Sequence, residues 1–252
     1  MNNLPFETAN YRQFQNNFLA SVLVGMVFCP SQDAETHKEQ WNSFTQELFS
    51  VGPLEGLFQK PIAINRGDHK LSYVFDKTRA LVQINDDGYQ NFADTVIPHA
   101  YKLKRFITEV AGSNVISQLD IRKIDMFQIM PEDGKSVDEN EIRKHFFSNS
   151  YLTHKEGLAQ LNTEETHIQG MLKHQWRDEN YVLTIRSAFI KMPGDGNGYR
   201  LILDTEEHYE PVGKINLDGL DKELIKMNKD LFNAFMWCIS DRVVSIMEKG
   251  KE

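Results

Sequence analysis

The order in which apolar patterns follow one another along the chain is the feature that most constrains its fold. An apolar run over residues 18–28, a helical pattern, three short strand patterns and a long helical pattern occur in the first part. The same order returns in the second part, where strand patterns cover residues 115–130, 168–176, 181–192 and 199–209. Strands and helices in this order predict an α+β fold, and the repeated order predicts two similar halves.

The boundary between the halves is predicted near Gly112, which ends the first long helical pattern. We assign residues 1–114 to an N-terminal α+β half and residues 115–252 to a C-terminal one, packed closely enough to form one structural domain. Turn residues between neighbouring strands predict antiparallel sheets. Helical patterns over 89–111 and 218–249 each carry one apolar face, so we expect these long helices to pack on one face of the sheets.

Composition excludes several classes of protein. The chain has 252 residues, of which 40% are hydrophobic and 25% charged, as in an ordinary folded domain. No apolar run reaches the roughly 20 residues of a membrane span, and the first residues lack the pattern of a signal peptide. Cys29 and Cys238 lie in apolar patterns that favour reduced core thiols, so we expect a cytoplasmic protein.

The strand pattern over residues 199–209 carries a candidate metal site. Alternate residues of an extended strand share a face, so Asp204, Glu206 and His208 line up while Glu207 points the other way. Oxygen and imidazole ligands in this arrangement suit a divalent ion, although a solvated strand end explains the same residues. Cysteines and histidines form no short-spaced zinc cluster, and no cofactor is expected.

Signatures of common catalytic sites are absent from the sequence. The glycine-rich segment 194–198 continues into a strand pattern and not a helix, which indicates a hairpin and not a phosphate loop. No Gly-x-Ser-x-Gly motif occurs. We therefore assign no catalytic residue. The alternative function is a small-ligand-binding or metal-dependent enzymatic α+β domain that uses the cleft between the halves.

Charged residues interrupt the strand pattern over 115–130. Asp120 and Arg122 share one face of this strand, while Lys123 and Asp125 interrupt its apolar face. A buried charge needs a partner, and both signs are present. The pattern therefore favours an internal ion-pair network over a recognition surface.

Polar side chains on the later strands predict a partner-binding surface. Lys173 and Gln175 share one face of their strand, and Arg186 and Arg200 lie in the neighbouring strands. An antiparallel sheet with helices on one side leaves its other face open to water or to a partner. Because a net charge of −8 opposes a general nucleic-acid binder, we expect another protein as the partner. Homodimerisation through a sheet edge or the C-terminal helix is a further alternative.

Three short segments resemble a known family of proteins. They are Val-Leu-Val-Gly-Met-Val-Phe at 22–28, Leu-Asp-Ile-Arg-Lys-Ile-Asp at 119–125 and Leu-Ile-Leu-Asp at 201–204. Their order resembles that in a family of sporadically distributed bacterial proteins of about this length with no established function. Asp120 and Lys123 stand where that family tends to carry Gly and Tyr.

The resemblance implies an architecture and no catalytic residue. Together with the polar sheet face, it predicts a non-catalytic, protein-binding component of a bacterial accessory system of the immunity or phage-defence type, which acts through this face or through the C-terminal helix. We expect the partner of such a component to be encoded nearby.

Overall fold

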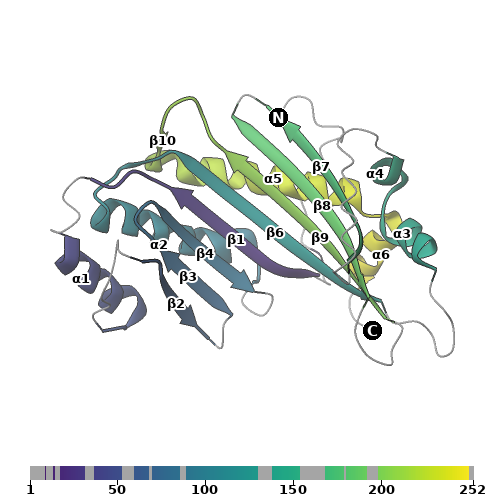
Figure 1. The fold of residues 1–252 in the computed structure, drawn as a ribbon, viewed down its shortest axis with the longest axis horizontal. Coiled ribbons are helices and arrows are strands. Elements are labelled where there is room, and N and C mark those ends of the chain that lie inside the picture. The colour runs from purple at the N-terminus through teal and green to yellow at the C-terminus, as the bar shows by residue number, and fades with distance from the viewer. Residues whose placement is uncertain are drawn as a thin grey trace.

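A single antiparallel sheet organises the molecule. The structure, a computed structural model, describes residues 9, 14, 18–31, 37–52, 60–67, 70–85, 89–129, 138–153, 168–178, 180–191 and 198–249. Within these ranges eight strands follow the order β2-β3-β4-β1-β6-β9-β8-β7 (Figure 1). Their bounds are β1 Leu19–Val27, β2 Ile62–Arg66, β3 Leu71–Phe75, β4 Arg79–Asn85, β6 Gln118–Ile129, β7 Ile168–Arg177, β8 Tyr181–Lys191 and β9 Tyr199–Tyr209. A separate pair joins β5 (Val115–Ile116) to β10 (Ile215–Asn216).

Helices pack on one face of the sheet, as the sequence predicts. Their bounds are α1 Lys38–Phe49, α2 Ile97–Arg105, α3 Glu139–Phe146, α4 Asn149–Thr153, α5 Leu220–Cys238 and α6 Asp241–Lys249. Short π-helical turns, η3 (Phe92–Val96) and η4 (Phe106–Val110), extend α2 at both ends. The long helices α2 and α5 run behind the sheet in Figure 1, and no described helix crosses the face turned to the viewer. None of the described helices combines the length and the apolar run that crossing a membrane requires.

We call the side that no described helix covers the helix-free face. It consists of the strand residues that share the orientation of Gly25 in β1, whose cross-strand neighbours are Leu81 in β4 and Asp120 in β6. Pairing on both sides makes β1 a central strand. This position explains why the residues on both faces of the strand are apolar. Val24 is fully buried against the helices, and Leu23 is half-buried on the helix-free face.

Strand pairing also joins the two predicted halves. β1 and β6 run antiparallel from Leu19 opposite Asp125 to Val27 opposite Gln118, with one irregularity near Leu19. The sheet therefore continues across the boundary between residues 1–114 and 115–252. The α+β class and the antiparallel sheet with helices on one face are confirmed.

Aromatic rings fill the core below β2, β3 and β4. Phe75 is fully buried at its centre. Five rings surround it with centroid distances of 4.6–6.0 Å, and they belong to Trp41, Phe44, Phe49, Tyr73 and Phe106. Rings from α1, β3 and η4 thus meet in one cluster, which holds α1 and η4 against the sheet.

The single C-terminal helix predicted over residues 218–249 is wrong, because the chain forms α5 and α6 with a break between them. Ile239 adopts an extended backbone and forms an isolated β-bridge with Phe147. The hydroxyl of Ser240 then accepts a hydrogen bond from the amide of Val243, 3.4 Å away, at the start of α6. Apolar spacing continues through the break, and the pairing with Phe147 replaces the helical hydrogen bonds there.

The two cysteines occupy different environments. Both thiols are free. Cys238 is fully buried, and burial raises its pKa well above the ordinary value. Cys29 is exposed, so the expectation that both are core thiols is wrong for this residue. It lies just after the last residue of β1, where the chain leaves the sheet. Of the hairpin predicted at 194–198, only Gly198 lies among the described residues.

Candidate functional site

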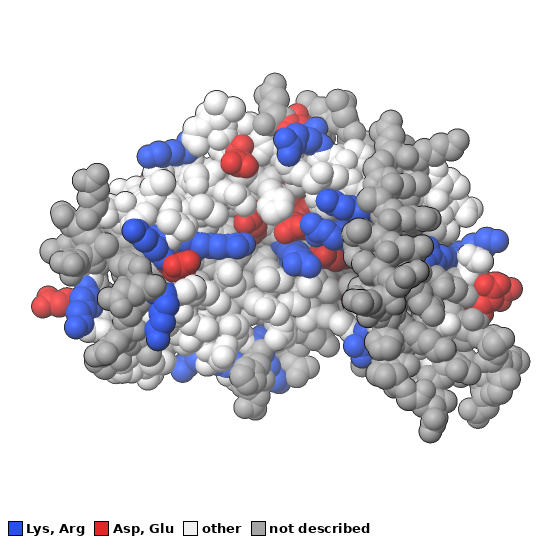
Figure 2. Space-filling view, in the orientation of Figure 1, with Lys and Arg blue, Asp and Glu red and all other residues white. Residues whose placement is uncertain are grey.

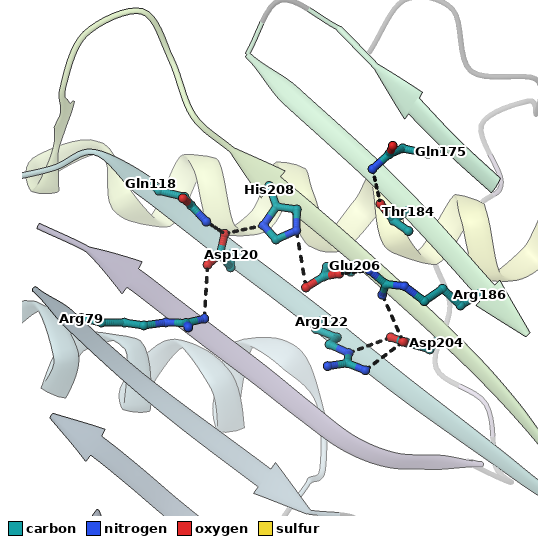
Figure 3. Close-up of polar contacts among 10 residues, drawn as sticks. All are labelled: Arg79, Gln118, Asp120, Arg122, Gln175, Thr184, Arg186, Asp204, Glu206 and His208. Atoms are coloured by element: carbon teal, nitrogen blue, oxygen red, sulfur yellow. Dashed lines mark hydrogen bonds and ion pairs between the residues drawn. The ribbon is translucent and has the colours of Figure 1, made fainter. Parts of the chain in front are cut away.

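Seven charged side chains form a continuous chain of ion pairs at the centre of the helix-free face (Figure 3). They come from β4, β6, β8 and β9, and positive and negative groups alternate. We call this set the ion-pair chain, and its members in order are Arg79, Asp120, His208, Glu206, Arg186, Asp204 and Arg122. An arginine stands at each end.

Two guanidinium groups hold Asp204. Arg122 binds it in a bidentate manner, with Nε 2.8 Å from Oδ1 and Nη2 2.9 Å from Oδ2. Arg186 donates from Nη1 to Oδ2 at 3.1 Å and from Nη2 to Glu206 Oε2 at 2.7 Å. The hydrogen bonds that Arg122 donates to Asp204 raise the pKa of Arg122. Charge-assisted, bidentate pairs are among the stronger polar contacts in proteins, so the end of the ion-pair chain at Asp204 and Arg122 is well ordered.

His208 is a cation at neutral pH. Its Nδ1 lies 2.7 Å from Asp120 Oδ1, and its Nε2 lies 3.4 Å from Glu206 Oε1. Hydrogen bonds to Asp120 and Glu206 raise the pKa of His208 to about 10. The hydrogen bond from His208 is also the main reason that the pKa of Glu206 falls to about 2. Both ring nitrogens of a protonated histidine donate, so His208 links the two carboxylates and does not act as a base.

Arg79 is a member of the ion-pair chain that comes from the first half, residues 1–114. Its side chain leaves β4 and crosses β1 to reach Asp120 on β6, with Nη2 3.8 Å from Oδ2 (Figure 3). Gly25 lies below this crossing: a Cβ atom there would lie 3.3 Å from Asp120 Oδ2 and 3.6 Å from Arg79 Nη2. The glycine therefore leaves room for the carboxylate of Asp120 beside β1. Because 3.8 Å is too long for a hydrogen bond, the donors of Arg79 stay available.

The candidate metal residues share a face but not a centre. Asp204, Glu206 and His208 all project from the helix-free face, as predicted. Their polar atoms are directed to different partners, since Asp204 faces Arg122 and Arg186 while His208 links Asp120 to Glu206. Among the described residues, no group of three or more His, Cys, Asp or Glu side chains is placed to hold a metal ion. The geometry therefore gives no support to a divalent site here.

The ion-pair network expected from the strand over 115–130 is present. Asp120 and Arg122 project from the same face of β6, and each pairs with residues of a neighbouring strand. The sequence did not identify Arg79 or the pairing of Asp120 with His208, because both depend on which strands are neighbours. Only the sheet order and the register, with Asp120 opposite His208, bring these groups together.

All four predicted partner-binding residues lie on the helix-free face. Arg186 belongs to the ion-pair chain, and Gln175 donates to Thr184 Oγ1 at 3.1 Å. Lys173 lies opposite Arg186 in the β7–β8 pair, and Arg200 lies opposite Gln128 in the β6–β9 pair. Neither Lys173 nor Arg200 forms a hydrogen bond or an ion pair with a described residue. The predicted set therefore contains paired and unpaired cations on one surface.

Polar groups also lie on the helix side of β6 and β9, below α5. Lys123 donates to Asn228 Oδ1 at 2.6 Å, and burial lowers its pKa while raising that of Asp125. Glu207 is fully buried, and neither of its carboxylate oxygens accepts a hydrogen bond from a described residue. Burial, and next the nearby carboxylate of Asp230, raise the pKa of Glu207 to about 9. Glu207 is therefore uncharged at neutral pH.

Comparison with known proteins does not assign this site. No family model matches the chain, and no curated protein matches its sequence. The chemistry of the helix-free face is therefore the basis for a functional proposal.

Neutralising Asp204 is expected to destabilise the protein. Asp204→Asn keeps the shape of the side chain but removes the charge that holds Arg122 and Arg186, and Asp204 is only 7% exposed. We expect the free energy of unfolding to fall by about 2–3 kcal/mol, measured by urea denaturation at pH 7. Asp218→Asn is the matched control, because Asp218 pairs with Lys104 at 3.7 Å while 87% of its side chain is exposed. Equal losses in both variants would show that the ion-pair chain adds no stability.

Proposed function

We propose that the protein is a non-catalytic binding protein that holds a protein partner on its helix-free face. The observation that carries this proposal is the sheet face that no described helix covers, on which apolar and charged side chains lie side by side. Part of its apolar surface comes from the first half, where Leu23, Val27, Val74 and Leu81 are half-buried. The ion-pair chain lies next to it, since Val27 is opposite Arg79 and Leu23 is opposite Arg122. Apolar surface bordered by arginine-rich polar groups is typical of protein interfaces.

On the helix-free face, the states of His208 and Glu206 support binding over catalysis. A general base needs a pKa near the working pH. The pKa values of His208 and Glu206 are moved away from neutrality in opposite directions, to about 10 and about 2. Both groups serve to order the surface.

We also propose that the two halves arose by duplication. Residues 1–114 contribute β2-β3-β4-β1 and residues 115–252 contribute β6-β9-β8-β7, so the order is repeated outward from the central β1–β6 pair. Under this proposal β1 corresponds to β6, β4 to β9, β3 to β8 and β2 to β7. The helices α2 and α5, which follow β4 and β9, correspond in the same way.

For the biological setting, we propose an accessory system of the immunity or phage-defence type, with the partner encoded nearby. The support is the resemblance of the three strand segments to the sporadically distributed bacterial family. Free thiols at Cys29 and Cys238 suit a reducing compartment such as the cytoplasm.

The proposal is tested with a purified partner and two point variants. A partner is first recovered from cells that naturally make the protein, then purified, and its stoichiometric complex is measured by light scattering and calorimetry. Leu81→Glu places a charge on the apolar part of the helix-free face. Ile225→Glu places the same charge on α5, where Ile225 is 59% exposed. We expect Leu81→Glu to weaken the complex at least about tenfold and Ile225→Glu to leave it unchanged.

Three outcomes contradict this proposal. Loss of binding in Ile225→Glu alone would place the interface on the C-terminal helix. Recovery of the chain alone, as a dimer of its own copies, would replace the partner by homodimerisation. Recovery of the chain alone with thermal stabilisation by a metal ion or a small metabolite would favour the small-ligand function. Circular dichroism of both variants confirms that each is folded.

A further inference from the structure

We infer that the segment of the partner that binds the helix-free face is acidic and carries apolar side chains between its carboxylates. This inference rests on the proposed function and adds the chemistry of the partner. It starts from the charges that the strands place on this face. In the described strands six basic side chains lie there, and they are Arg79, Arg122, Lys173, Arg177, Arg186 and Arg200. Three acidic side chains lie there in the described strands, and they are Asp120, Asp204 and Glu206.

This surplus of positive charge stands out against the rest of the molecule. The whole chain has a net charge of −8, so the remaining surface is more acidic than the average. Protonation of His208 adds one further positive charge to the helix-free face. Figure 2 shows lysine and arginine side chains gathered across the middle of this face, with the few acidic groups between them. Such a local field attracts an acidic ligand and orients it during encounter.

Several of these cations have hydrogen-bond donors that are available to a ligand. Lys173, Arg177 and Arg200 form no hydrogen bond or ion pair with a described residue. The arginines at the ends of the ion-pair chain are the most exposed of its paired arginines, with 55% of the Arg79 side chain and 40% of the Arg122 side chain accessible. An incoming carboxylate can therefore pair with these groups and leave the internal contacts of the ion-pair chain intact.

The carboxylates of the ion-pair chain are already neutralised by its cations. Asp204 is held by two arginines, and Glu206 by Arg186 and His208. Each therefore repels an incoming acid much less than a free carboxylate would. Lys173, Arg177 and Arg200, which pair with no described residue, lie around this neutralised centre. This arrangement suits a ligand that carries few negative charges, placed apart from one another.

Apolar side chains on the same face explain why the segment must be more than acidic. Val27 of β1 lies opposite Arg79, Leu81 lies two residues further along β4 on the same face, and Leu23 lies opposite Arg122. All three apolar side chains are half-buried. They are covered only when a ligand brings apolar groups of its own. A protein segment with acidic and apolar residues satisfies both parts of the surface at once.

A nucleic acid fits this face less well. Single strands bind proteins by stacking their bases on aromatic rings, and the described strands place no Phe, Tyr or Trp side chain on the helix-free face. A phosphate backbone also needs an uninterrupted basic track, whereas Asp120, Glu206 and Asp204 occupy the middle of this surface.

The test measures binding of three labelled probes by fluorescence anisotropy. The first is a peptide that repeats Glu-Glu-Leu, the second repeats Gln-Gln-Leu at the same length, and the third is an oligothymidylate of equal charge. The face variant combines Lys173→Glu, Arg177→Glu and Arg200→Glu. The control variant combines Lys222→Glu, Lys229→Glu and Lys249→Glu, which changes the net charge equally at exposed positions of α5 and α6.

We expect the Glu-Glu-Leu peptide to bind the wild type, with an affinity that falls at higher salt. The face variant should weaken this binding at least about tenfold, and the control variant by no more than about twofold. Equal binding of the Gln-Gln-Leu peptide, or equal weakening in both variants, would overturn the inference. Tighter binding of the oligothymidylate than of the acidic peptide would replace it by nucleic-acid binding.

The same variants separate this inference from the proposed function. If the purified partner loses affinity with Leu81→Glu but binds the face variant as tightly as the wild type, the helix-free face is the interface and the acidic segment is wrong. If the partner binds Leu81→Glu and the face variant both at full strength, the proposed function itself fails.

Discussion

Phe75→Ala is expected to lower the free energy of unfolding by about 3–5 kcal/mol. Phe75 is fully buried and has aromatic neighbours from three different elements, including Trp41 of α1 at 5.6 Å and Phe106 of η4 at 4.6 Å. Truncation leaves a cavity that rings cannot fill, because ring side chains move as rigid plates. The transfer free energy of the removed ring and the cost of the cavity therefore add.

Chemical denaturation followed by circular dichroism measures this effect. Phe75→Leu is the matched variant, since it keeps an apolar side chain of intermediate volume and should cost clearly less. A loss below about 1 kcal/mol for Phe75→Ala, or equal losses for the two variants, would contradict the view that this ring organises the aromatic core below β2, β3 and β4.

Glu207→Gln is expected to stabilise the protein at neutral pH and to reduce its pH dependence. The pKa of Glu207 is about 9 in the folded protein and 4.5 in the unfolded chain. The folded state therefore keeps a proton that the unfolded state releases. This raised pKa contributes stability that is fully present below pH 4.5 and is lost as the pH rises through about 9. The glutamine variant has no such proton, so it should be more stable than the wild type by about 2–3 kcal/mol at pH 7.

Urea denaturation of both proteins at several pH values between 5 and about 9 tests the sign. Glu206→Gln is the matched control on the same strand, because Glu206 faces the opposite side and its pKa is lowered to about 2. Its stabilising contribution is present above pH 4.5 and is lost as the pH falls through about 2, so its replacement should destabilise the protein at pH 7. A wild type and a Glu207→Gln variant with parallel pH profiles would contradict the buried, protonated state of Glu207.

Much of the fold follows from local patterns. The strand predicted over 199–209 has the same bounds as β9, and the pattern over 168–176 differs from β7 by one residue. Turn residues and alternation act over a few neighbouring positions, so they can be recognised without knowing the rest of the chain. Helix ends were less predictable: α5 and α6 separate at Ile239, where a contact with the distant Phe147 decides the backbone.

The same division applies to the candidate site. Alternation along single strands was enough to place Asp204, Glu206 and His208 on one face and Glu207 on the other, because side chains of an extended strand alternate by geometry. The partners of these groups were decided by the tertiary structure. Asp120 meets His208 across 88 residues, and Arg79 meets Asp120 across β1, where Gly25 leaves room for the carboxylate. Charge pairing needs contact in space, and contact between distant strands is set by sheet order and register, which no local pattern contains.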